Sequence, residues 1–352
     1  MSHAAIPDVQ KILATVHNLL AFVLAVSLAG VPTTTSAAEK CRDLFVSTPM
    51  QIKKVETPQN ILSELYAESK TLSFGNADHE SPKAFLELEK FLKVHGHDRE
   101  LKSIAIEASS ELAPFFESAS TRDLTADDWS AIGPWEWYLE TQAETVHIMT
   151  VLVPLIRKLN LERARDPLLL VPIDGIEAST MMSGVKQEGD KVDLEVPISP
   201  KSLIDWMFIQ SIDGELKTAE NYAKLISHRW PNRKGIVIYH QAHVLRNLQA
   251  WGVTRSHAKV RAIKAPLSWV DYVSKSDPIF AANYRVVFFD TASKSNPSGV
   301  IRDLPTSPTA YAFRTTDNPT FNSDSFLATY RTRSIRISDS RKQIADGVIR
   351  LP

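Results

Sequence analysis

The chain has 352 residues, of which 43% are hydrophobic and 23% are charged, the balance of a folded globular protein. Its formal net charge of −1 gives no overall field that would attract nucleic acid or anionic lipid, so the sequence predicts no nucleic-acid partner. The single cysteine, Cys41, excludes an intramolecular disulfide framework and a cysteine-rich zinc site.

The N-terminal residues are typical of a secretory signal peptide. An uncharged apolar run, residues 18–31, follows Lys11 and His17, and small residues precede Glu39. This run is shorter than the roughly 20 residues that a membrane span needs. We therefore expect cleavage after about residue 38, a mature protein in the periplasm or outside the cell, and no stable membrane span after cleavage. The alternative is an uncleaved membrane anchor.

From residue 70 onward, short apolar runs alternate with longer amphipathic runs. This alternation predicts an α/β fold with a mainly parallel core sheet and crossover helices. The expected strands are residues 71–75, 102–107 and 166–174, the strand that starts at residue 235, and a later strand at 283–290. The expected helices are residues 81–96, a segment within 128–160 that Pro154 bends or interrupts, and residues 199–210 and 214–230.

The sequence divides into four parts. Residues 1–38 are the signal peptide, 39–69 an N-terminal lead-in, 70–290 the α/β core, and 291–352 a C-terminal extension with short strands. Within the core, the glycine- and proline-containing residues 178–200 indicate an excursion or a hairpin.

Reactive side chains stand at the carboxyl ends of the expected strands. Glu107 ends the second strand, Asp174 ends the third, and His240 and His243 follow the fourth. Ligands bind outside the carboxyl ends of the strands in open α/β sheets. We therefore expect these four residues to line one crevice.

Histidines beside a carboxylate suit two kinds of chemistry. The imidazoles could bind a divalent metal together with Glu107 and activate its water. Alternatively, one imidazole could take a proton from water while the others stabilise an acyl oxyanion. Both routes lead to hydrolysis. The His240/His243 spacing is a weak signal by itself, because hydrogen-bonded histidines at a strand end explain it equally well.

Other catalytic classes lack their motifs. The sequence contains no phosphate-binding G-x-x-x-x-G-K-[ST], no G-x-G-x-x-G, no H-E-x-x-H and no G-x-S-x-G. Nucleotide-dependent enzymes and serine hydrolases with a nucleophile elbow are therefore excluded as readings of this sequence.

Six short segments follow one another in a defined order: FGNADHES (74–81), IAIEAS (104–109), LIRKLN (155–160), LLVPIDG (169–175), TAENYAKLI (218–226) and IYHQAHV (238–244). In this order they resemble the successive motifs of the erythromycin esterase-like proteins, a group related to the haem-binding ChaN and to the TraB/Tiki proteins. The resemblance covers about residues 70–250 and implies the α/β fold of that group.

The resemblance also implies which residues form the site. His79, Glu107, His240 and His243 would line the catalytic crevice, with one histidine activating water against an ester or a related carbonyl. The acidic residue of the first motif is replaced by Asn76. Asp78 or Glu80 could take its place, and Asn76, Asp78, Glu80 and Asp174 are the expected substrate-contacting residues.

Three functions follow from these patterns. The preferred one is a secreted hydrolase of an ester or amide bond in a small molecule, with His79 or His240 as general base and Glu107 orienting the imidazoles. The second is a non-catalytic periplasmic protein that binds haem or a metal through the same histidines. The third is an inactive scaffold that keeps the fold for protein–protein contact.

Overall fold

The computed structural model describes residues 52–76, 81–133, 135–175, 185–188, 191–194, 214–256, 259–266, 268–291, 304–305, 307–318, 335–337 and 344–352. Contacts divide the chain into two units. The larger unit holds the central sheet and the helices that pack on it, and a β-hairpin formed by β4 (Val185–Glu188) and β5 (Lys191–Leu194) belongs to the smaller unit. The expected hairpin within residues 178–200 is thus confirmed.

The central sheet has seven strands in the order β10-β12-β9-β1-β6-β2-β3. All neighbours are parallel except β10, which runs antiparallel to β12 at one edge. The strands are β1 (Thr71–Asn76), β2 (Leu101–Ser109), β3 (Leu169–Asp174), β6 (Lys234–His240), β9 (Tyr284–Thr291), β10 (Tyr311–Arg314) and β12 (Gly347–Leu351). The predicted α/β fold with a mainly parallel sheet is confirmed.

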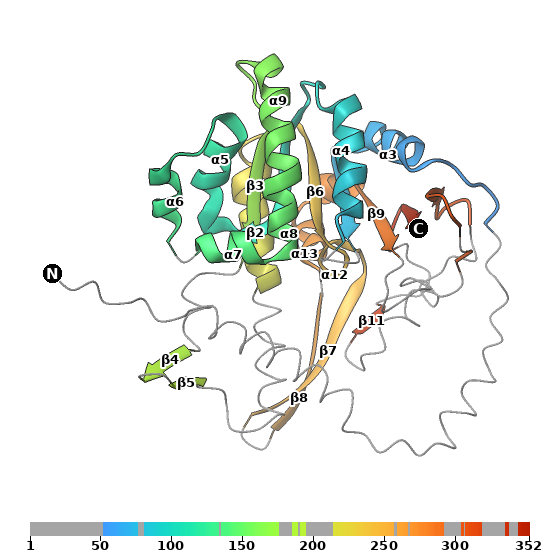
Figure 1. Ribbon diagram of the computed structural model, residues 1–352. Helices are drawn as coiled ribbons and strands as arrows, with labels where there is room; N and C mark the ends of the chain where they lie inside the picture. The colour runs from blue at the N-terminus through green and yellow to red at the C-terminus, as the bar shows by residue number, and fades with distance from the viewer. Residues whose placement is uncertain are drawn as a thin grey trace. The chain divides into compact units, whose positions relative to one another are not determined.

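Helices cover both faces of this sheet, because side chains along each strand alternate between two apolar layers (Figure 1). In β6, Ile236 and Ile238 pack in one layer, whereas Val237 and Tyr239 pack in the other. The first layer is covered by α3 (Pro58–Ala67), α4 (Lys83–His95), α5 (Ala113–Thr121) and α9 (Val153–Arg163). The second is covered by helical residues 214–222, the π-helical turn η3 (Ala223–Ser227), α13 (Trp269–Ser276) and α14 (Pro278–Asn283).

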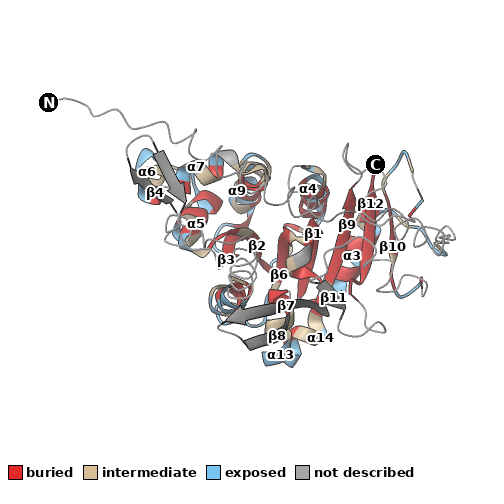
Figure 2. Ribbon diagram, turned by 90° about the horizontal axis from the view of Figure 1, so that it is seen from below, coloured by how far each residue is buried: buried red, intermediate tan, exposed pale blue. Residues whose placement is uncertain are grey.

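Burial follows this arrangement closely (Figure 2). All residues of β1 and β12 are buried, and so are the five central residues of β6. A continuous buried run is the pattern of a parallel strand covered on both faces, which explains why the sequence predicted β6 as a buried strand.

The segment expected to form one long helix is divided. It consists of α6 (Ala126–Ile132), α7 (Trp135–Thr141), α8 (Ala143–His147), the π-helical turn η2 (Ile148–Leu152) and α9. The 3-10 turn η1 (Ser110–Leu112) and α5, which come before this segment, were not predicted. Pro154 lies in the first turn of α9, directly after η2. Proline has no backbone N–H to donate to the preceding helical turn. The π-helical turn therefore lies where the sequence predicted that Pro154 would bend or interrupt the helix.

Several elements were not predicted. They are α3, α13, α14, β12, and a long antiparallel hairpin of β7 (Leu248–Ser256) and β8 (Lys259–Pro266) that pairs with β11 (Ile335–Ile337). Residues 291–352 also supply two strands of the central sheet, β10 and β12. The helix expected at 199–210 lies outside the described residues, as do residues 1–38.

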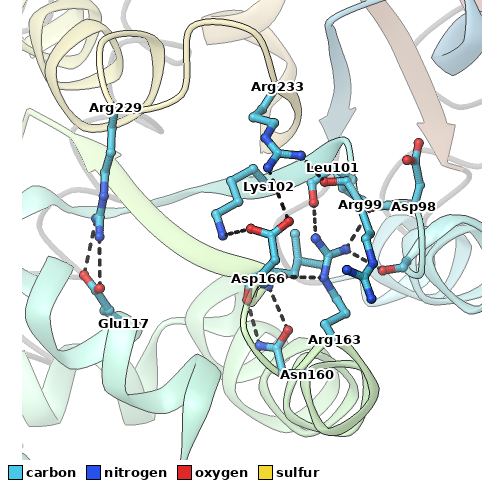
Figure 3. A network of polar contacts seen from close by, with 12 residues as sticks. Asp98, Arg99, Leu101, Lys102, Glu117, Asn160, Arg163, Asp166, Arg229 and Arg233 are labelled. Carbon is cyan, nitrogen blue, oxygen red and sulfur yellow. Dashed lines mark hydrogen bonds and ion pairs between the residues drawn. The ribbon is translucent and has the colours of Figure 1, made fainter.

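A polar network closes the amino edge of the sheet beside β2 and β3 (Figure 3). The Lys102 ammonium lies 2.5 Å from an Asp166 carboxylate oxygen. The buried Arg163 guanidinium donates hydrogen bonds to backbone carbonyls on the turn into β2, at 2.7 Å (Gly96), 3.0 Å (Asp98) and 2.5 Å (Leu101). One side chain therefore ties the end of α9 to the start of β2.

None of the helices within the described residues combines the length and apolar character that crossing a membrane requires.

Candidate functional site

The predicted site residues stand at the carboxyl ends of four adjacent strands, β1, β6, β2 and β3. Asn76, the last residue of β1, pairs in register with His240, the last residue of β6. Glu107 lies near the end of β2, and Asp174 is the last residue of β3. Parallel strands bring these ends to one edge of the sheet, as the sequence pattern predicted.

Glu107 makes a direct contact with the neighbouring strand. The backbone N–H of His240 donates a hydrogen bond of 2.5 Å to Glu107 Oε2. This bond forms at the residue where β6 ends and the chain turns into the short helix α12 (Gln241–Val244). The carboxylate therefore fixes the turn that positions His240.

The turn brings the two histidines together. In α12 the backbone leaves the extended conformation, so that the rings of His240 and His243 lie with centroids 5.7 Å apart and planes at 61°. Gly75 allows α12 to pack on β1, because a Cβ at that position would lie 3.2 Å from Val244 and 3.3 Å from the Val287 carbonyl. The glycine in the first motif thus has a packing role beside the histidines.

A buried carboxylate that the sequence reasoning missed holds His243. Glu215 is 6% exposed, and one of its oxygens contacts His243 Nδ1. Its other oxygen accepts the backbone N–H of Trp269 at 2.6 Å, and the Ser268 hydroxyl donates to the His243 carbonyl at 2.5 Å. The start of α13 and the helix that begins at residue 214 therefore clamp His243 from two sides.

The sequence did contain a signal for Glu215. Ala219, Tyr222 and Ile226 form the buried stripe of this helix, and Glu215 lies one turn earlier on the same stripe. A carboxylate at a buried helical position needs a partner. This position therefore indicated a buried ion pair or a site residue.

The negative charges of the site converge on His243. Burial would lower the pKa of its imidazole, but the charges of Glu215, Glu107 and Asp174 outweigh this effect and raise the pKa to about 10. The side chain is still 31% exposed, so solvent reaches the ring. His243 is therefore an imidazolium at neutral pH.

The negative charges of Glu107 and Asp174 also act on two tyrosines. Burial and the charges of Asp174 and Glu107 raise the pKa of the Tyr239 phenol well above its usual range. Loss of surrounding water and the same two carboxylates also raise the pKa of Tyr138. Glu107 and Asp174 therefore shift the pKa values of the same three side chains, Tyr138, Tyr239 and His243, although they stand on different strands.

The end of β3 is held by the same helix that carries Glu215. The Asn221 amide donates to the carbonyls of Ile173 at 3.2 Å and Asp174 at 3.3 Å. Thr218 Oγ1 accepts the backbone N–H of Gly175 at 2.9 Å. One helix therefore positions both Asp174 and His243.

Three of the predicted residues, Asp78, His79 and Glu80, lie outside the described residues. Within the part of the chain that the structure describes, no three His, Cys, Asp or Glu side chains are grouped so that they could hold a metal ion. The described residues thus bring together Asn76, Glu107, Asp174, His240 and His243, with Glu215 as an added member.

The comparisons with known proteins concern the fold. No protein-family model and no curated protein sequence matches the chain. Three solved structures to which it is similar are an erythromycin esterase mutant in its open conformation, a Bacillus cereus protein, and the haem-binding ChaN of Campylobacter jejuni. Each is 10% identical in sequence, with TM-scores of 0.46, 0.48 and 0.36.

The alignments extend over most of each chain. They cover 83%, 84% and 71% of this chain and 92%, 92% and 96% of the other three, in the same order. The similar structures therefore include an erythromycin esterase and a ChaN protein, the group that the sequence motifs resemble. At 10% identity and with TM-scores of 0.48 or less, these similarities assign neither a family nor an activity.

Proposed function

We propose that the chain hydrolyses an ester or amide bond of a small molecule at the carboxyl edge of the sheet. The observation that carries the proposal is the His243–Glu215 pair, which stands beside His240 and within the field of Glu107 and Asp174. Buried carboxylates that shift a histidine pKa by several units, at an edge where ligands bind in this class of fold, are typical of catalytic sites.

In this proposal His243 has an electrostatic role. Its Nδ1 is engaged by Glu215, so Nε2 is the ring nitrogen that can serve a substrate. With a pKa of about 10 the ring is charged at neutral pH and has no lone pair with which to accept a proton. An imidazolium N–H stabilises the oxyanion that develops when water attacks an acyl carbon.

The general base is then a different histidine. His240 stands next to His243 with ring centroids 5.7 Å apart, and its backbone is fixed by Glu107. His79, at the position of the first motif, is the other candidate. In this scheme the base removes a proton from water, the water oxygen adds to the carbonyl carbon, and collapse of the tetrahedral intermediate releases the alcohol or amine.

The test is hydrolysis of 4-nitrophenyl acetate and longer 4-nitrophenyl esters by the parent protein and by His243→Gln. Glutamine keeps a hydrogen-bond donor but removes the charge, so kcat should fall at least about tenfold, less than the roughly 100- to 1000-fold that loss of a whole oxyanion donor costs. His97→Gln is the matched control, because His97 is half-exposed on the surface and pairs with Glu162. Equal kcat values for all three proteins would disprove the role of His243.

Binding of haem or a metal by the same histidines is the second candidate. A histidine whose Nδ1 contacts a carboxylate presents Nε2 in the way that metal-bound histidines do. Titration with haem, followed by absorbance, and with Zn²⁺, followed by calorimetry, tests this function. One-to-one binding that is lost in His240→Ala, together with no turnover of any ester, would favour a binding protein over a hydrolase.

We also propose that the protein acts in the periplasm or outside the cell after loss of residues 1–38. The support is the apolar run at residues 18–31 followed by small residues. N-terminal sequencing of the protein expressed at full length would test this: a mature start near residue 38 or 39 agrees with export, and a retained residue 1 contradicts it.

A further inference from the structure

A cavity lies at the amino edge of the sheet, at the opposite ends of the strands that carry the site. Its floor includes Thr71 of β1, Ser103 of β2 and Gly235 of β6. Gly235 lies five residues before His240 on the same strand, about 16 Å away in an extended chain. The cavity has a volume of about 790 Å³, which lies within the range of small-molecule sites.

Small residues create this space. A Cβ added to Gly235 would lie 3.2 Å from Ser103 Oγ, so the floor is kept open by a glycine opposite a serine. On the facing wall, Ala219 and Ala223 lie where larger side chains would project into the cavity. The small side chains at these wall positions therefore leave room for the cavity.

Aromatic and aliphatic side chains form part of the remaining walls. They are Tyr222, Ile226, Trp230, Tyr272, Ile279 and Phe280. The Arg229 guanidinium lies 4.6 Å from the centre of the Trp230 ring. It also pairs with Glu117 (Figure 3). A held aromatic wall is the surface against which a planar ring packs.

Polar and charged side chains also line the cavity. The hydroxyls of Thr71 and Tyr222 lie 3.0 Å apart at the floor, and the Tyr222 hydroxyl is also bonded to Ser227. Lys70, Glu220, His228 and Arg233 are exposed residues of the lining, whereas the Lys234 ammonium donates to the Tyr66 carbonyl and the Asp277 carboxylate accepts N–H groups at the start of α14. The buried part of the lining, which is apolar apart from hydroxyl groups, matches an uncharged ligand with an apolar ring and a hydroxyl or carbonyl group.

The wall also contains an irregular helix turn. Residues Ala223, Ile226 and Ser227, all of which line the cavity, belong to the π-helical turn η3. Single π-helical turns occur frequently at functional sites. The same helix begins with Glu215, so a ligand here would contact the element that holds His243.

We propose that this amino-edge cavity is a second binding site, for an uncharged aromatic or alicyclic molecule that carries a hydroxyl or carbonyl group. The site is separate from the histidines and does not depend on the proposed hydrolysis. The ring packs against Trp230, Tyr272 and Phe280, and the polar group reaches the Thr71–Tyr222 hydroxyl pair.

The probe for the test is 2-naphthol, whose fluorescence reports transfer from water to an apolar site. Saturable one-to-one binding is expected for the parent protein. Ala223→Phe places a ring in the cavity and should weaken binding at least about tenfold, as loss of a ring-sized volume implies. Ala223 is outside the two buried core clusters, so the larger side chain can enter open space.

A second variant avoids the folded interior. Ile279 is 68% exposed at the rim, and Ile279→Glu places a charge beside an apolar entrance without disturbing the core. It should also weaken naphthol binding. Ala131→Phe, at an exposed position on α6, is the matched control and should bind within about twofold of the parent, as expected for a distant surface change.

The outcomes separate clearly. Loss of affinity in Ala223→Phe and Ile279→Glu, with normal affinity in Ala131→Phe and in His243→Gln, supports the second site. Unsaturable binding, equal affinity in both cavity variants and the parent, or loss of affinity in His243→Gln overturns it, the last because the probe would then occupy the carboxyl edge. Circular dichroism and the melting temperature confirm that each variant is folded.

Discussion

Replacing Glu215 by Gln should make the stability of the protein depend differently on pH. Glutamine has nearly the same shape, and its carbonyl oxygen can still accept the Trp269 N–H that Glu215 accepts at 2.6 Å. What disappears is the negative charge beside His243. The change therefore isolates the electrostatic part of the contact.

The sign of the effect follows from the raised pKa of His243. An ordinary histidine has a pKa of 6.5, and the folded-state value is about 10, so the folded protein binds this proton more tightly than the unfolded chain does. The stabilisation is therefore complete below pH 6.5, declines as the pH rises from 6.5 to 10, and is absent above that range.

The magnitude follows from the size of the shift. A rise from 6.5 to about 10 corresponds to at most about 5 kcal/mol, at about 1.4 kcal/mol per pKa unit. Solvent screens a ring that is 31% exposed, and Glu107 and Asp174 contribute part of the shift. We therefore expect Glu215→Gln to lower the free energy of unfolding by about 2 kcal/mol at pH 6.

The assay is urea unfolding at pH 6, 8 and 10. The difference between the parent and Glu215→Gln should be largest at pH 6 and should shrink towards pH 10. Glu117→Gln is the control: Glu117 is half-exposed and pairs with Arg229, so its removal should cost less than about 1 kcal/mol at every pH. A Glu215→Gln deficit that stays constant or grows between pH 6 and pH 10 would refute the reasoning.

Three further predictions concern other parts of the fold. Arg350→Leu leaves the fully buried Asp290 carboxylate, 2.5 Å from that guanidinium, without its cation, and should cost about 3–5 kcal/mol in urea unfolding, most of which the double change with Asp290→Leu should recover. Arg163→Lys loses the planar fork that reaches several carbonyls and should cost about 2 kcal/mol by thermal unfolding, whereas the exposed Arg165→Lys should cost almost nothing. Asn221→Ala removes the donor that holds the end of β3 and should lower the kcat for 4-nitrophenyl acetate about tenfold or more with little change in KM, because the residue positions Asp174; an unchanged kcat would contradict that role.

Several parallel strands of the sheet could be predicted because they are covered on both faces. The sequences of β6 and of the edge strand β3 are continuous apolar runs, as expected for such strands. The carboxyl ends of β2, β3 and β6 then place Glu107, Asp174, His240 and His243 at one edge of the sheet.

The burial of charged side chains was not predicted. β12 includes Arg350, which is 3% exposed and pairs with Asp290 on the neighbouring strand. The partner is 60 positions away in sequence, so nothing local marks the arginine as buried. Glu215 was missed because a single carboxylate in a helix usually faces water, although its place on the buried stripe of the helix was a local signal.

The helices after residue 268 carried signals that the apolar pattern alone did not show. The Ser268 hydroxyl accepts the Val270 N–H at 3.2 Å, and Asp277 accepts the N–H groups of Ile279 and Phe280 ahead of α14. Serine or aspartate followed by such a segment, with Pro278 in the first turn, is a helix start. Reading capping residues beside periodicity would have placed both α13 and α14.

The position of β12 has a consequence for how the chain reaches its native state. It is the last described strand in chain order, yet it lies inside the sheet, with β9 on one side and β10 on the other. During synthesis every other described strand leaves the ribosome first, and β9 then has an edge of unsatisfied backbone groups. The sheet therefore stays incomplete until β12 has been synthesised. Native pairing is therefore a late event of high contact order, and the nascent chain is exposed to edge-to-edge association until β12 arrives.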